Sequence, residues 1–116
     1  MTSLSPAEFA LSFFREPATL TVRVCGELDY DTSEDLVDAV VARLEEGPPP
    51  REVRLDFGAL TWIDSSGLAA LLMIHRRTDS AGAVLRLENR PGFLERLLHV
   101  TNVLEHLTAP ASGGRG

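Results

Sequence analysis

Apolar and polar residues alternate along several short stretches of the chain. In residues 19–25 the apolar positions are Leu20, Val22 and Val24, and polar Thr21 and Arg23 lie between them. This period of two is typical of a half-buried strand. An apolar stretch precedes it, and because only residues 15–18 separate the two, they are expected to form an antiparallel hairpin. The predicted strands are residues 9–14, 19–25, 53–57 and 83–87.

Two glycines are interpreted as strand ends. Gly26 is expected to break the second strand, so that residues 27–30 form a loop, and the third strand is expected to stop near Gly58. A short extended piece at Trp62 and Ile63 would follow.

Apolar residues at helical spacing predict helices after the second, third and fourth strands. Asp31, Thr32 or Ser33 can supply the N-cap oxygen of the first helix. The second helix is apolar on most sides, which predicts a helix enclosed between other elements rather than one at the surface. The predicted helices run from residues 31–33 to Gly47, from 66 to 79, and onward from Pro91.

Strands that alternate with helices favour parallel pairing, whereas the opening hairpin must be antiparallel. The sequence therefore predicts an α/β fold with a mixed sheet of four to five strands and three to four helices. Residues 103–107 fit either a final strand or a final helix. We expect one domain over residues 1–108 and a disordered tail over residues 109–116, which are rich in Gly, Ala and Ser.

Composition and charge narrow the class of protein. The 116 residues carry a formal net charge of −6 and one cysteine, Cys25. An acidic chain is a poor partner for nucleic acid or an anionic membrane surface, both of which attract clustered basic residues. The longest apolar run, residues 68–74, is too short to span a bilayer, and no export segment is recognisable. We expect a cytoplasmic protein that does not insert into membranes.

The chain lacks the residue patterns of common enzymes. His75, His99 and His106 are isolated, without the spacing of metal ligands. Ser65 lies at a strand-to-helix turn, but the glycine that a hydrolase nucleophile needs two positions earlier is Ile63. No phosphate-binding loop is present. The prediction is a protein without catalytic residues, metal or cofactor.

The serine at this turn has two interpretations. If the helix starts near Ser66, Ser65 lies at its N-cap, where serine commonly stabilises a helix by about 1 kcal/mol. The same position has backbone N–H groups without intrahelical partners, which makes it receptive to an anion such as a phosphate. Spacing alone does not separate these two roles.

Two short motifs resemble those of a known family. Gly26-Glu27-Leu28-Asp29, followed by Thr32, is similar to the first motif of the STAS domain family. Asp56 and the run Ile63-Asp64-Ser65-Ser66-Gly67-Leu68 resemble the second. The resemblance covers roughly residues 9–108. One departure is Thr101-Asn102-Val103, where the family more often has Thr-Gly-Leu, which affects only the local bend.

The resemblance implies an anti-sigma factor antagonist, a phosphoprotein that regulates transcription by partner switching. In that case Ser65 is phosphorylated by a serine kinase that is also the anti-sigma factor, and a serine phosphatase resets the switch. Asp29 would lie beside Ser65 and Asp64 would shape the turn. The implied partner-binding residues are Asp29, Asp64, Ser65, Ser66 and Gly67, and Ser66 is an alternative site of modification.

A second possibility keeps the fold without the switch. The chain would then be a constitutive STAS subunit of a larger complex, such as a lipid-transport ATPase or a stress-signalling assembly. The intact serine at position 65, which can accept phosphate, favours the switch.

Overall fold

The computed structural model describes residues 9–101. This part of the chain contains four strands and three helices, which confirms the predicted α/β class. The elements in chain order are β1 (Ala10–Arg15), β2 (Thr19–Leu28), α1 (Ser33–Leu44), β3 (Glu52–Ile63), α2 (Ser65–Ser80), β4 (Val84–Glu88) and α3 (Gly92–Val100). The predicted element at residues 103–107 and the predicted tail lie outside the described residues.

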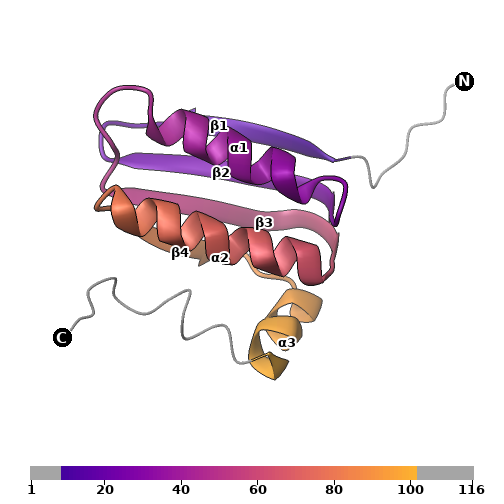
Figure 1. Ribbon diagram of the computed structural model, residues 1–116. Helices are drawn as coiled ribbons and strands as arrows, with labels where there is room; N and C mark the ends of the chain where they lie inside the picture. The colour runs from indigo at the N-terminus through magenta and orange to yellow at the C-terminus, as the bar shows by residue number, and fades with distance from the viewer. Residues whose placement is uncertain (1–8, 102–116) are drawn as a thin grey trace, which may run out of the picture.

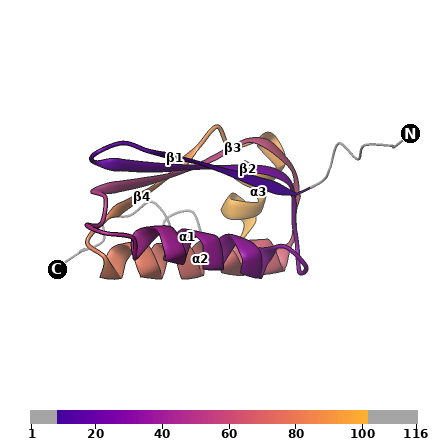
Figure 2. The same ribbon diagram turned by 90° about the horizontal axis from the view of Figure 1, so that it is seen from above.

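The four strands form one mixed sheet in the order β1-β2-β3-β4. β1 and β2 are the expected antiparallel hairpin, while β3 pairs with β2 and β4 in parallel. Both parallel connections contain a helix, and α1 and α2 lie side by side along the sheet (Figure 1). Seen from above, the two helices form a layer against one face of the sheet (Figure 2). The fold is therefore a two-layer α/β sandwich.

The core lies between the sheet and the helices. Alternate residues of β2 and of the first half of β3 point into it, because successive side chains of a strand lie on opposite faces. The opposite sheet face carries charged pairs, including Glu52 with Arg54 and Arg86. The largest fully buried side chains include Phe57, Leu20, Leu28, Leu36, Leu55, Leu71, Ile74, Leu94 and Leu98.

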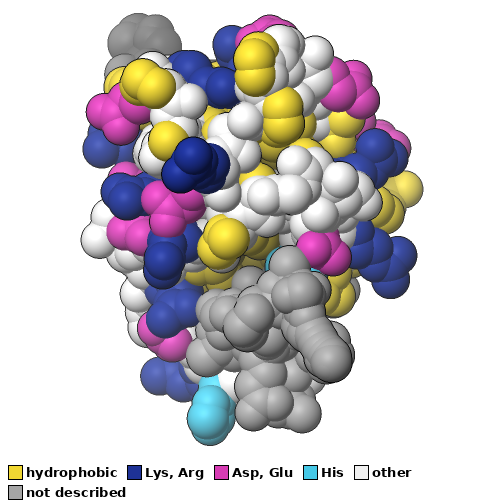
Figure 3. Space-filling model, turned by 90° about the vertical axis from the view of Figure 1, so that its left-hand side faces the viewer, with side chains coloured by type: hydrophobic (Ala, Val, Ile, Leu, Met, Phe, Trp, Pro, Cys, Tyr) yellow, Lys and Arg dark blue, Asp and Glu magenta, His cyan; other side chains and the backbone are white. Residues whose placement is uncertain are grey.

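The end of the molecule where α1 and α2 terminate carries charges of both signs. Arg and acidic side chains are interspersed over this face (Figure 3). Arg43 lies 3.8 Å from Glu46, and Arg15 donates a hydrogen bond to the carbonyl oxygen of Pro48 at 2.8 Å. Mixed charge of this kind is typical of a solvated surface.

Both glycines that were interpreted as strand ends lie inside strands, so those two predictions are wrong. β2 continues through Gly26 to Leu28, and β3 continues through Gly58 to Ile63. Two register shifts each place an extra β3 residue against β2, which interrupts the alternation in the sequence without ending the pairing. Gly26 adopts a φ of 90°, a conformation that other residues rarely accept.

The prediction that the second helix is enclosed is also wrong. One side of α2 packs on the core through residues such as Leu71 and Ile74, but Ala69 and Met73 are exposed on its other side. The fold has only two layers, so nothing in residues 9–101 covers the outer side of this helix. Ala69 and Met73 on the outer side of α2 are therefore part of the surface of the described residues.

The first turn of α2 lies very close to the end of β2. A Cβ atom added to Gly67 would lie 2.6 Å from the carbonyl oxygen of Leu28 and 2.7 Å from Cγ1 of Ile63. Real Cβ atoms do not approach other atoms so closely, so position 67 accepts only glycine without displacement of the helix.

We expect Gly67→Ala to destabilise the fold by about 1–3 kcal/mol, because the added methyl group overpacks a contact with backbone. The control is Gly92→Ala at the start of α3, where an added Cβ would meet no atom within 4 Å. Urea unfolding of both variants measures the difference. Equal stability of the two variants would contradict the close approach.

Asp56 of β3 links β2 and the residue that follows β4 on the sheet face opposite to the helices. Its Oδ1 accepts hydrogen bonds from Asn89 Nδ2 at 3.0 Å and from the Gly58 N–H at 2.9 Å. Its Oδ2 lies 3.7 Å from Nε of Arg23 on β2. The bonds from Asn89 and Gly58, with the charge of Arg23, lower the pKa of this carboxyl despite its partial burial.

A carboxyl whose pKa is lower in the folded state stabilises the fold above its unfolded pKa and loses this contribution as pH falls through the folded value. We expect the wild type to lose more stability than Asp56→Asn between about pH 6 and pH 3. At neutral pH the variant should be less stable by about 1 kcal/mol, since an uncharged acceptor replaces the carboxylate. Urea unfolding at several pH values measures both effects, and parallel pH profiles would refute this role of Asp56.

Candidate functional site

The parallel pairing of β2 and β3 brings two turns together. Leu28 is the partner of Ile63 at the end of the ladder, and the Asp64 N–H donates to the carbonyl oxygen of Leu28 at 3.2 Å. The turn after β2, which begins at Asp29, therefore lies beside the start of α2. Ligands of α/β folds commonly bind at this edge, beyond the carboxyl ends of parallel strands.

Asp29 organises its own turn. Its Oδ1 accepts hydrogen bonds from the N–H groups of Asp31 at 3.0 Å and Thr32 at 3.2 Å. The Thr32 hydroxyl lies 2.8 Å from the carbonyl oxygen of Glu27 and accepts from the Asp29 N–H at 2.9 Å. Both side chains thus hold the path of the chain from β2 into α1.

This turn corrects the predicted cap of α1. Thr32 is the N-cap residue, within the predicted range, but its side chain makes no capping hydrogen bond. The Thr32 hydroxyl is engaged with the backbone of residues 27 and 29 instead, and Asp29 accepts two of the N–H groups that precede the helix. Sequence reasoning missed this because the Thr32 hydroxyl is engaged by backbone groups of the preceding turn, which the helical pattern does not contain.

Asp64, not Ser65, is the N-cap of α2. Asp64 is extended and its Oδ1 accepts hydrogen bonds from the N–H groups of Ser66 at 2.9 Å and Gly67 at 3.1 Å. The helix begins at Ser65, one residue earlier than predicted. The capping interpretation of Ser65 is therefore wrong, because the longer acidic side chain before it already occupies that role.

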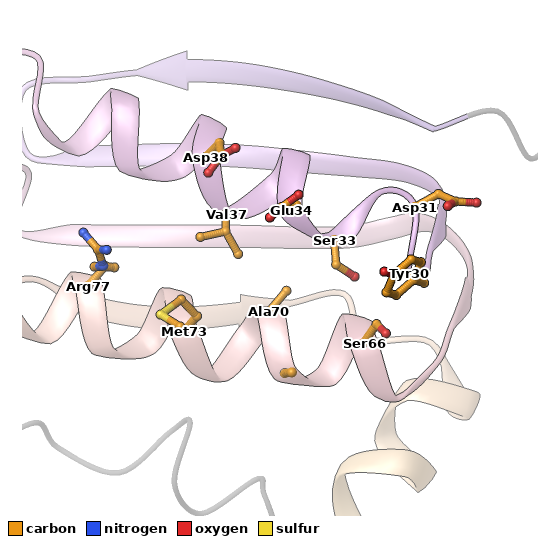
Figure 4. Close-up of a pocket in the computed structure, with 11 residues that line it drawn as sticks. Tyr30, Asp31, Ser33, Glu34, Val37, Asp38, Ser66, Ala70, Met73 and Arg77 are labelled. Carbon is orange, nitrogen blue, oxygen red and sulfur yellow. The ribbon is translucent and has the colours of Figure 1, made fainter.

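Ser65 and Ser66 differ in their surroundings. Ser65 is exposed at the first position of α2, whereas Ser66 is half-buried and lies near Tyr30 (Figure 4). No hydrogen bond occupies the Ser65 hydroxyl within residues 9–101. The Ser65 side chain is thus the more accessible of the two.

The electrostatics at Ser65 follow from the Asp64 cap. A helix N-terminus attracts anions through its free N–H groups and its dipole. Here Asp64 already accepts from two of these groups, and its carboxylate adds negative charge beside Ser65. A phosphate on Ser65 would find fewer donors than a bare helix end offers, so most of its charge would face solvent or a partner.

A groove between α1 and α2 opens next to this turn. It has a volume of about 660 Å³, and Tyr30, Ser66, Ala69 and Met73 are among its lining residues. Exposed aromatic side chains stand near the two turns, since Tyr30 is 81% exposed and Trp62 is 53% exposed. Sequence reasoning did not single out Tyr30 or Met73, because only tertiary packing distinguishes an exposed apolar residue from a buried one.

Other kinds of site receive no support within residues 9–101. There is no group of three or more His, Cys, Asp or Glu side chains that could hold a metal ion in this range. His106 lies outside it. None of the helices in the described residues is long and apolar enough to cross a membrane.

Known proteins share this architecture. An anti-sigma factor antagonist from Mycobacterium paratuberculosis superimposes with a TM-score of 0.75 at 21% identity, covering 90% of this chain and 86% of that one. The Bacillus cell fate determinant SpoIIAA in its phosphorylated form gives a TM-score of 0.66 at 21% identity, with coverages of 91% and 93%. A sulfate transporter family protein from Wolinella succinogenes gives 0.67 at 21% identity, with coverages of 77% and 70%.

These structures establish the fold, which occurs both in antagonists and in transporter proteins. The sequence itself decides the family. Residues 11–108 match the family described as "Mlab, STAS domain", and this range includes both motifs, the four paired strands from Leu11 onward and the turn at Ser65. The chain therefore belongs to the STAS domain family.

Proposed function

We propose that this protein is an anti-sigma factor antagonist whose binding is switched off by phosphorylation of Ser65. In its unphosphorylated form it binds an anti-sigma factor serine kinase and thereby releases the sigma factor. The observation that carries this proposal is the exposed Ser65 hydroxyl at the first position of α2, beside the Asp29 turn. The chain acts as a binding protein and kinase substrate, and a serine phosphatase restores it.

The charge at the turn explains how one phosphate can act without a change of fold. Phosphorylation adds about −1.5 to −2 charges to a surface that already contains the carboxylates of Asp29 and Asp64. Asp64 holds the N–H groups of Ser66 and Gly67, so these donors are not free to neutralise the phosphate. A partner surface fitted to a neutral hydroxyl would have to bury an unpaired dianion, which costs several kcal/mol.

The second candidate is a constitutive STAS subunit of a larger complex, such as a lipid-transport ATPase or a stress-signalling assembly. The likeness to a sulfate transporter family protein supports it, because the same fold occurs there with a comparable TM-score. The two candidates differ in one requirement. A constitutive subunit does not need an accessible hydroxyl at position 65, whereas the switch depends on it.

The test uses purified protein and each anti-sigma factor serine kinase encoded by the source organism. We expect one kinase to bind the wild type and to place a single phosphate on Ser65, located by mass spectrometry. Ser65→Ala should bind that kinase but remain unmodified. Ser65→Asp should bind at least about tenfold more weakly, a loss of about 1.4 kcal/mol.

Two control variants test whether the loss of kinase binding is specific to position 65. Ser66→Ala tests the alternative hydroxyl, and Ser80→Asp adds a charge at an exposed serine at the opposite end of α2. Ser66→Ala should still gain a single phosphate on Ser65, and Ser80→Asp should bind as the wild type does. If no kinase binds, or if Ser65→Asp and Ser80→Asp bind equally well, the constitutive subunit becomes the better explanation.

A further inference from the structure

The groove between α1 and α2 is an exposed apolar surface on the helical layer. The exposed Ala69 and Met73 of α2 line it together with the buried Ala70 and the half-buried Val37 of α1, and Val37 points toward α2 (Figure 4). Met73 is 41% exposed, although methionine is usually buried. Tyr30 stands at the end of the groove near Ser66 (Figure 4). An exposed apolar surface with a polar border is typical of a site that binds another protein.

The border of the groove is strongly acidic on one side. Glu34 and Asp38 line it from the first turns of α1 and Asp31 lines it from the turn before α1, while Arg77 of α2 lies toward the other end (Figure 4). None of these three carboxylates forms an ion pair with another group in residues 9–101. They contrast with the mixed charges at the end shown in Figure 3, where Arg43 lies near Glu46. The groove therefore offers unpaired negative charge next to apolar side chains.

We propose that the groove binds a basic amphipathic helix of the anti-sigma factor kinase, an inference that rests on the function proposed above. Apolar side chains of that helix pack between Val37 and Met73, and its Arg or Lys side chains face the carboxylates of Glu34 and Asp38 on α1 and of Asp31 in the turn before it. Helices commonly bind grooves in this way, with apolar anchors three or four residues apart. From Ser66 to Arg77 the groove follows about 16 Å of α2, which accommodates about three helical turns.

The groove and Ser65 have separate roles in this arrangement. Ser66 lines the groove but Ser65 does not, so a bound helix leaves the Ser65 hydroxyl accessible to the active site of the kinase. Binding in the groove supplies affinity for the kinase. The charge at Ser65 determines whether the kinase surface that contacts this serine can bind there. Arg77 also fixes the orientation of the bound helix, because an acidic residue of the partner is favoured only at the Arg77 end of the groove.

The first experiment compares charge reversals on the same helix. Glu34→Lys combined with Asp38→Lys reverses two groove carboxylates, and Asp35→Lys is the control, because Asp35 is an exposed acid of α1 that does not line the groove. We expect the double variant to bind the kinase at least about tenfold more weakly at low salt and the control to change binding less than about twofold. Increasing salt should narrow the difference, since exposed charges are screened.

The apolar contact has its own pair of variants. Met73→Asp places a charge in the groove, whereas Val84→Asp places one at an exposed apolar position of β4. Only the former should weaken kinase binding, again by about tenfold or more, and thermal melts of both variants confirm that each is folded. If the groove and control variants bind equally well while the wild type still binds, the groove is not the binding site. The proposed function would remain standing. Absence of any kinase binding by the wild type would overturn both.

A photo-crosslinking residue at position 73 identifies the occupant directly. In the complex of the whole chain with the kinase, we expect a crosslink to a kinase segment with Arg or Lys and Leu at helical spacing. A crosslink to an acidic kinase segment, to a second copy of this chain or to no kinase residue would overturn the inference.

Discussion

The arrangement of the site depends on the contact between the first turn of α2 and the ends of β2 and β3. Leu28 and Ile63 close the parallel ladder, and Gly67 brings the helix so near that a methyl group would collide with the Leu28 carbonyl. This contact fixes where α2 begins relative to the turn at Asp29. Because α2 then runs back along the sheet beside α1, the same contact also sets the position of the groove between the two helices.

The carboxylates of Asp29 and Asp64 stabilise the fold and also give the site negative charge. Asp64 caps α2 and Asp29 holds the chain entering α1, so each is fixed by hydrogen bonds to backbone N–H groups. Asp64 keeps its negative charge directly before Ser65 in the chain, because its bonds are to neutral N–H groups. A phosphoryl group added there changes the charge of a surface whose backbone is already fully organised. The proposed switch therefore requires no second conformation of the protein.

The two faces of the molecule differ in what they offer a partner. The open sheet face carries paired charges, such as Arg23 with Asp56 and Arg54 with Glu52, which satisfy one another. The helical layer carries acids that form no ion pair within residues 9–101, and exposed apolar side chains, next to the Ser65 turn. Protein interfaces commonly combine a desolvated apolar contact with complementary charge, and within residues 9–101 the helical layer carries both next to the Ser65 turn.

The sequence by itself determined the strands, the helices, the mixed sheet and the turn that contains Ser65. Alternation and helical spacing report which side of an element is buried, and they are local properties of the chain. Tertiary structure decided the features that depend on contacts between residues far apart in the sequence. The pairing of β2 with β3 continues through bulges past Gly26 and Gly58, because hydrogen bonds to a distant strand outweigh the local interruption. The apolar outer side of α2 stays exposed because residues 9–101 form no third layer, and the groove exists only where residues far apart in sequence meet.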